Sequence, residues 1–309
     1  MSDVRRALIW FVALVAIVIA GDHVLAWVLH KVLMRSQFRY SRLYRGGNSA
    51  DLIVLGDSRG VHSFYAPAIE EVTGLRAMNL SYNSMSPRIA EAILMDYVEH
   101  NRPPRMVVIE VTSSIVSGAL ASELQTYAGL SPRLAALYAE EHPVAAVAGR
   151  TFRLFPLNSG FFLEALHYMW QTDQDWIHRD AMPPALRTRP RNPWRLVPFA
   201  DNVDALVRIV GLLHHRGIEV RLVIAPYGPS NVPVNVTAYA ALITRRAQTP
   251  VWNYVGAVTD PDEFADQVHL NERGSRVFLR MLQRDGAFGM TSPPGSMTPF
   301  HSHPHGGSQ

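Results

Sequence analysis

The residues best suited to chemistry are one serine and one histidine that stand far apart in the chain. Ser58 lies in the stretch GDSRG, directly after the apolar run at residues 52–55. A serine hydroxyl is a poor nucleophile unless a base takes its proton and a third group orients that base. Asp266 and His269 stand three residues apart near the end of the chain and supply such a pair. We predict that Ser58 is a nucleophile, that His269 is its general base and then acid, and that Asp266 orients His269.

Each of these residues also has an ordinary structural explanation. Ser58 can be a solvated turn residue, and Asp57 can cap the helix that follows instead of touching a substrate. His62 and His269 can be surface histidines. Three further histidines fall at the ends of expected helices, where the helix dipole favours them: His100, His214 and His215. No pair of histidines has the spacing of a zinc site, so we expect no metal and no cofactor.

The apolar patterns predict the elements that must position Ser58 and His269. Strands are expected at residues 51–55, 76–80, 106–111, 220–225 and 251–255. Helical patterns lie between them, at 67–72, 87–100, 201–215 and 271–284. This alternation predicts an α/β fold of three layers, in which helices cover both faces of a mostly parallel sheet. Ligands of such sheets bind beyond the carboxyl ends of the strands, which is where Ser58 and the loop of His269 are expected.

Acyl transfer also needs hydrogen-bond donors for the oxyanion of the tetrahedral intermediate. The stretch AMNLSYNSMSP follows the second expected strand. It would bring backbone N–H groups, together with Asn79 or Asn83, to the same edge of the sheet. These groups are the candidate donors.

In their order along the chain, these motifs resemble those of the SGNH or GDSL-like hydrolase superfamily. The family pattern is a GDS block after the first strand, a Gly or Asn block after the second, a GxND block after the third, and a DxxH block near the C-terminus. The GDS at 56–58 matches the first block, and the DQVH at 266–269 matches the last. The resemblance covers residues 50–284. It implies a flavodoxin-like α/β/α fold, with the nucleophile and the base in these two blocks.

The two middle blocks depart from the family pattern. Ser81 stands where the second block has glycine, and its backbone N–H can still serve as a donor. Ser114, in VVIEVTSSI, stands where the third block has the asparagine of the oxyanion hole, so one donor is replaced or missing. The resemblance therefore implies an oxyanion hole built from Ser58, Ser81, Asn83 and Ser114, with slow turnover of simple esters.

The first 30 residues predict a membrane anchor. An apolar run at 7–21 is interrupted by Asp22 and His23 and resumes at 24–29, and about 20 apolar residues cross a bilayer core. The alternative is a cleaved signal peptide, but the apolar character continues past the candidate cleavage site and favours an uncleaved anchor. Charge does not settle the orientation. Basic residues flank the helix on both sides: Arg5 and Arg6 before it, and Lys31, Arg35, Arg39, Arg42 and Arg45 after it.

The chain is expected to have four parts. They are an anchor at 1–30, a basic connector at 31–49, an α/β domain at 50–284 and a disordered tail at 285–309. An insertion at about 115–200 interrupts the domain; it is helical to about residue 170 and then rich in proline and arginine. We expect it to lie over the sheet edge, with the loop at 172–194 as a candidate lid or polymer-binding edge.

Composition excludes several functions. The chain has no cysteine, so it has no disulfide, no thiolate metal site and no cysteine nucleophile. Its arginines are scattered and do not alternate with aromatic residues on one face, so a nucleic-acid partner is not expected.

The altered middle blocks are similar to those of membrane-anchored SGNH proteins of cell-envelope acylation, such as the alginate O-acetylation proteins and the D-alanyl transfer protein of teichoic acid synthesis. That resemblance implies a single-pass protein of the bacterial inner membrane with its domain in the periplasm. Its role would be that of a serine acyltransferase or esterase, with O-acetyl transfer to an envelope or exported polysaccharide, beside a multi-spanning membrane acyltransferase. The alternative is a catalytically impaired SGNH-fold scaffold, or a polysaccharide-binding partner of that acyltransferase.

Overall fold

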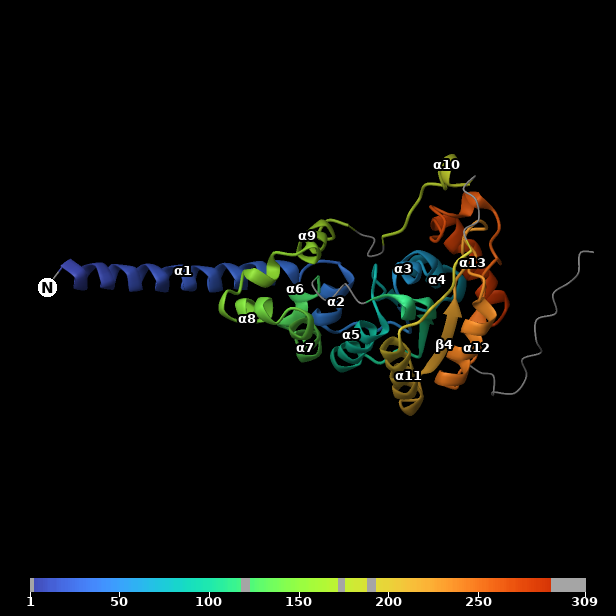
Figure 1. Ribbon diagram of the computed structural model, residues 1–309, viewed down its shortest axis with the longest axis horizontal. Coiled ribbons are helices and arrows are strands. Elements are labelled where there is room, and N and C mark those ends of the chain that lie inside the picture. Colours follow the sequence, from blue (N-terminus) through green and yellow to red (C-terminus); the bar gives the residue numbers. More distant parts are fainter. Residues whose placement is uncertain (1–2, 118–122, 172–175, 188–192, 290–309) are drawn as a thin grey trace, which may run out of the picture.

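A five-stranded parallel sheet forms the centre of the protein (Figure 1). A computed structural model describes residues 3–117, 123–171, 176–187 and 193–289. The strands are β1 Leu52–Leu55, β2 Ala77–Asn79, β3 Met106–Glu110, β4 Glu219–Ile224 and β5 Val251–Asn253. Their order is β2-β1-β3-β4-β5, which is the flavodoxin-like order. The predicted fold class and all five strands are confirmed, and strand ends differ from the expected ranges by one or two residues.

Helices cover both faces of this sheet, as the alternation predicted. Ile53 and Leu55 of β1 face one apolar core, whereas Leu52 and Val54 face the other. The first core is closed by α5 Pro87–His100, α11 Ala200–His215 and α12 Val236–Ala247. The second is closed by α4 Ala66–Thr73 and α13 Glu272–Arg284. Both faces of β1 are buried, which explains why its sequence is apolar without alternation.

The N-terminal helix α1 Asp3–Leu33 is one continuous element of 31 residues. It is long and apolar enough to cross a membrane, as a membrane anchor or a signal sequence would be. Its last turns join the domain, because Ala26 and Leu33 are buried in the first core.

The segment at 31–49, expected as a connector, belongs to the domain core. It forms α2 Arg39–Arg45, and Phe38, Tyr40 and Leu43 are at most 1% exposed. The rings of Phe38 and Tyr40 contact those of Tyr82 and Phe161. Aromatic rings bury large apolar areas, so this cluster outweighs the basic character that suggested a solvated linker. The domain therefore begins near the end of α1 and not at residue 50.

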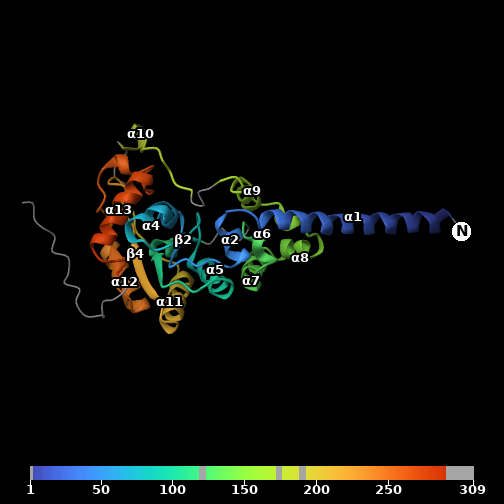
Figure 2. The same cartoon turned by 180° about the vertical axis from the view of Figure 1, so that it is seen from behind.

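The insertion is helical, as predicted, but it packs beside α1 as well as beside the sheet. It follows η1 Val111–Ile115, and its helices among the described residues are α6 Gln125–Ala128, α7 Pro132–Glu141, α8 Pro143–Thr151, η3 Phe155–Leu157, α9 Gly160–His167 and α10 Pro184–Arg187. In both views, α6 to α9 lie along the last part of α1, and α10 lies near α13 (Figures 1 and 2). The loop at 172–194 lies partly outside the described residues, at 172–175 and 188–192.

The domain also extends past residue 284. Ala287 and Phe288 are buried in the second core, and Arg221 Nε donates to the carbonyl of Ala287 at 2.9 Å. The expected boundary of the tail at 285 is therefore too early. The remainder of that tail, residues 290–309 with its three alternating histidines, lies outside the described residues.

Candidate active site

Ser58 is the first residue of a short helix, α3 Ser58–Ser63, that begins where β1 ends. The Asp57 carboxylate accepts the N–H of Arg59 at 2.9 Å and so caps α3. The glycines on either side are required by close packing. A Cβ on Gly56 would lie 2.8 Å from the Glu110 side chain, and a Cβ on Gly60 would lie 2.5 Å from Ser81 Oγ. The GDSRG stretch therefore forms a tight turn that presents Ser58 at the carboxyl edge of the sheet.

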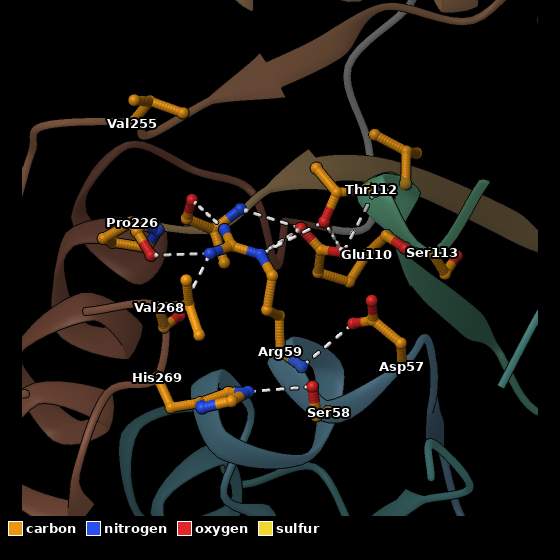
Figure 3. Close-up of polar contacts among 12 residues, drawn as sticks. Asp57, Ser58, Arg59, Glu110, Thr112, Ser113, Pro226, Val255, Val268 and His269 are labelled. Atoms are coloured by element: carbon orange, nitrogen blue, oxygen red, sulfur yellow. Dashed lines mark hydrogen bonds and ion pairs between the residues drawn. The ribbon is translucent and has the colours of Figure 1, made fainter. Parts of the chain in front are cut away.

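The structure brings Ser58, His269 and Asp266 together. His269 Nε2 lies 2.8 Å from Ser58 Oγ, as predicted for a serine–base pair (Figure 3). His269 Nδ1 lies 2.8 Å from Asp266 Oδ2. The other Asp266 oxygen accepts the backbone N–H groups of Val268 and His269, at 2.8 and 2.9 Å. The hydrogen-bond network assigns the Nδ1 proton to the Asp266 side and leaves Nε2 to accept from the serine hydroxyl.

The electrostatics of Asp266 suit an orienting carboxylate. Burial by itself would raise the pKa of this carboxyl group. The hydrogen bond from His269 and those from the backbone N–H groups outweigh burial and lower the pKa of Asp266 to about 2. Asp266 is therefore ionised throughout the neutral range, and its charge holds the His269 ring in one orientation.

A buried arginine that the sequence analysis did not select links the two halves of this site. Arg59 follows Ser58 directly, and its guanidinium donates to the carbonyl of Val268, which precedes His269, at 3.1 Å (Figure 3). It also donates to the carbonyls of Ala225 and Pro226, just after β4, at 2.6 and 3.2 Å. The feature of the sequence that could have indicated this role is the position of the arginine, directly after the GDS block.

Two carboxyl groups lie close to this arginine. Arg59 Nε is 3.5 Å from Glu110 Oε1 and donates to Thr112 Oγ1 at 3.1 Å. Burial raises the pKa of Glu110 to about 7, although the Arg59 charge opposes this change. Burial also raises the pKa of Asp57, again against the Arg59 charge. The Arg59 guanidinium lies 3.4 Å from the centre of the Tyr227 ring, so it is enclosed on that side as well.

The predicted oxyanion hole is largely not formed. The Ser81 N–H donates to Asn79 Oδ1 at 2.9 Å, so it is already engaged. The Asn79 amide in turn donates to the carbonyls of Gly60 and Phe64. Asn83 is exposed, and no hydrogen bond places it at Ser58 among the described residues. What remains is the backbone N–H of Ser58, at the first position of α3, where a helix offers no acceptor.

Ser114 is also wrong as an oxyanion donor. After β3 the chain turns through η1 and directs this side chain into the first core. Its Oγ lies 2.7 Å from the hydroxyl of Tyr239, and its carbonyl accepts the side-chain amide of Asn202. The Ser114 hydroxyl therefore joins η1 to α12 and takes a structural role. The Ser81 hydroxyl, in contrast, is buried beside Gly60 with no hydrogen-bond partner among the described residues.

Two histidines lie beside His269 and a tryptophan packs against both of them, and only one of these three residues was selected from the sequence. His62, for which a surface position was one alternative, is 1% exposed. Its ring stacks on that of His178 at 4.4 Å, and its centroid is 5.0 Å from that of His269. Trp176 packs edge-on against His62 and His178, at 5.0 and 4.6 Å. The spacing of 62, 178 and 269 in the chain gives no signal of this cluster.

These surroundings keep the two extra histidines neutral. Burial, followed by the neighbouring His269 and His178, lowers the pKa of His62 to about 3. Burial and His269 also lower the pKa of His178. His178, Asp266 and His269 offer ligand atoms within 4.8 Å of one another, so a divalent metal ion could bind there. Such an ion would bind the Asp266 oxygen and a His269 nitrogen, and so break the hydrogen bonds that these atoms now form with each other and with Ser58.

Comparisons with known proteins add little to this geometry. No protein family model and no curated protein sequence matches the chain. An inferred acylhydrolase from Bacteroides fragilis is 12% identical with a TM-score of 0.40, over 79% of this chain and 89% of that one. A GDSL-like lipase from Bacteroides thetaiotaomicron is 11% identical with a TM-score of 0.39, over 76% and 86%. At this level of similarity the activities named for these two proteins are not evidence for an activity of this chain. The assignment of the site rests on its own residues.

Proposed function

We propose that the chain is a serine acyltransferase or esterase with an SGNH-like domain. The observation that carries this proposal is the pair of 2.8 Å hydrogen bonds from Ser58 to His269 and from His269 to Asp266. At that distance a serine hydroxyl can pass its proton directly to an imidazole. The lowered pKa of Asp266 supports the same role, because a charged carboxylate stabilises the imidazolium that forms.

The reaction would proceed in two halves. Ser58 Oγ adds to the carbonyl carbon of an acyl ester while its proton passes to His269 Nε2, and the oxyanion accepts a hydrogen bond from the Ser58 N–H. His269 then protonates the leaving oxygen, the ester C–O bond breaks, and the acyl group stays on Ser58. In the second half His269 takes a proton from a sugar hydroxyl or from water. That oxygen attacks the acyl carbon, the bond between this carbon and Ser58 Oγ breaks, and Ser58 Oγ regains its proton from His269.

The substrate class and the location are finer parts of the same proposal. We infer that the acceptor or donor is a cell-envelope or exported polysaccharide, and that the domain works in the periplasm beside a multi-spanning acyltransferase of the inner membrane. Trp176 supports a sugar polymer, because it is 48% exposed and packs beside the histidines that surround the triad. The apolar length of α1 supports membrane attachment.

A second function is favoured by one observation. Ser81 and Ser114, two of the expected oxyanion donors, are engaged in other hydrogen bonds. Removing a single oxyanion donor typically costs about 10²–10³-fold in turnover. The alternative is therefore an impaired SGNH-fold scaffold that holds a polysaccharide or a partner without turning it over.

Labelling with a fluorophosphonate probe separates the two functions. The full-length protein in detergent micelles is expected to become labelled on Ser58, with the modified peptide identified by mass spectrometry. Ser58→Ala and His269→Ala should abolish labelling, whereas Ser84→Ala, an exposed serine outside the triad, should not. Absence of labelling in a folded protein that still retains polysaccharide would overturn the catalytic proposal in favour of the scaffold.

The periplasmic location has its own test. A phosphatase fused to the C-terminus should be active in cells, and a fluorescent protein that folds only in the cytoplasm should stay dark at the same position. The reverse pair of results would place the domain in the cytoplasm, as the basic residues after α1 would favour.

A further inference from the structure

The helix α1 is longer than a bilayer core and divides into two parts. At 1.5 Å per residue its 31 residues span about 46 Å, whereas the hydrocarbon core is about 30 Å thick. Residues 3–21 contain no buried residue and would span about 28 Å. Asp22 follows, and its carboxylate accepts the backbone N–H groups of Arg153 and Leu154. Protein contacts thus begin where the hydrocarbon core would end, at about Asp22.

Residues 125–170, here called the collar, lie alongside the last part of α1 (Figures 1 and 2), where they face His23 to His30. The collar carries large apolar side chains that point to solvent in the isolated chain. They are Val144, Val147, Phe152, Phe155, Leu163 and Trp170, each between 39% and 83% exposed. Apolar and aromatic residues in this position are typical of a surface that rests in the headgroup layer of a membrane. The collar therefore extends the apolar surface of α1 sideways at the membrane boundary.

A cavity of about 400 Å³ lies between α1 and the collar. His23, Trp27 and His30 line it from α1, at spacings of four and three residues that place them on one face of the helix. Arg150 and Arg153 line it from the collar. The lining contains no aspartate or glutamate, and neither arginine forms an ion pair with a described residue. Most of the remaining wall is apolar, with small residues of α6 and α8.

We propose that this cavity binds the headgroup of an anionic phospholipid from the bilayer that α1 crosses. The phosphate would lie between Arg150 and Arg153, since the planar guanidinium group matches phosphate oxygens in geometry as well as in charge. The acyl chains would leave along the apolar surface of α1, past the exposed ring of Trp27, which lines the cavity. A zwitterionic headgroup fits less well, because its own cation would face the two arginines.

The experiment measures which lipid stays with the protein. The full-length protein is exchanged into mixed micelles that contain equal amounts of phosphatidylglycerol and phosphatidylcholine, and the retained lipid is counted by native mass spectrometry. Two basic contacts at about 1 kcal/mol each correspond to a preference of about 30-fold for phosphatidylglycerol. The variant with Arg150→Gln and Arg153→Gln should lose that preference.

The matched control carries Arg216→Gln and Arg245→Gln, which removes the same charge from exposed positions at the ends of α11 and α12. It should keep the preference, as should Ser58→Ala, so a failure here is distinct from a failure of the proposed catalysis. Equal retention of the two lipids, or an unchanged preference in the Arg150 and Arg153 variant, would refute the lipid site. Displacement of the lipid by millimolar glycerol phosphate would also overturn it, and would reassign the cavity to a soluble phosphate ester.

Discussion

Replacing Arg59 by methionine tests whether the buried guanidinium positions the triad. The substitution keeps an unbranched apolar side chain, and it removes the guanidinium that lies over the Tyr227 ring together with every side-chain donor. It leaves the carbonyl of Val268, next to His269, without its partner at 3.1 Å, and it leaves Glu110 without the cation at 3.5 Å. A displacement of about 1 Å at a reacting group can cost about 10²-fold in rate. We therefore expect kcat on a small acetyl ester to fall by about 10–100-fold, with a smaller change in KM.

The same variant should lose stability in a way that depends on pH. Removing one partner of a buried ion pair costs about 3–5 kcal/mol. The pKa of Glu110 is raised to about 7, so the stability that this group contributes is fully present below its unfolded pKa and is lost as pH rises to about 7. Without Arg59, which lowers this pKa, the loss continues above pH 7. The difference in unfolding free energy between wild type and variant, here called the gap, should widen between pH 7 and 8 by up to about 1.4 kcal/mol.

Urea unfolding of the full chain in detergent micelles, followed by tryptophan fluorescence, measures this gap at several pH values. Arg216→Met is the matched control, because it removes an exposed arginine at the end of α11 and should change neither stability nor kcat. A gap that is constant from pH 6 to 8 would refute the argument about Glu110. An unchanged kcat in a folded Arg59→Met variant would refute the positioning role.

Four other predictions concern the surroundings of Ser58. Asp266→Asn should lower kcat by about 10³–10⁴-fold with little change in melting temperature, because the amide no longer holds the His269 tautomer; equal activity would remove Asp266 from the triad. Zinc ions should inhibit reversibly, and His178→Ala should weaken the inhibition at least several-fold, as measured by titration with and without a chelator. His62 has a lowered pKa of about 3, so its stabilising effect is present above pH 6.5 and is lost as pH falls toward 3; His62→Phe should therefore lose less stability than wild type between pH 6.5 and 5 in urea unfolding. Trp176→Ala should raise KM for a polysaccharide substrate but leave the hydrolysis of a small acetyl ester unchanged, and equal effects on both would exclude a sugar-binding role.

Local patterns in the sequence were sufficient for the parts of the protein whose structure depends on neighbouring residues. The apolar runs predicted β1 to β5, and those of β1 and β3 do not alternate because these two strands are buried on both faces. The 3.6-residue pattern predicted α5 to its end residues. Strand and helix then alternate, which dictates a parallel sheet, and a parallel sheet brings Ser58 and His269 to one edge. The hydrogen bond between them, across 211 positions of the chain, forms at that edge.

Contacts between distant segments decided the remaining features. Whether Ser114 faced the site or the core depended on η1 and on Tyr239, which lies 125 positions away, and no local pattern specifies that contact. The burial of Phe38 and Tyr40 depends on aromatic partners from the insertion. Those partners are distant in the sequence, so only the basic residues around Phe38 and Tyr40 were apparent, and they suggested a linker. Arg59 and His62 are polar residues that sequence patterns assign to the surface. Their burial is stable only because carbonyls after β4, a carboxylate at the end of β3 and the ring of His178 are brought together by the fold, and the sequence alone does not determine those distances.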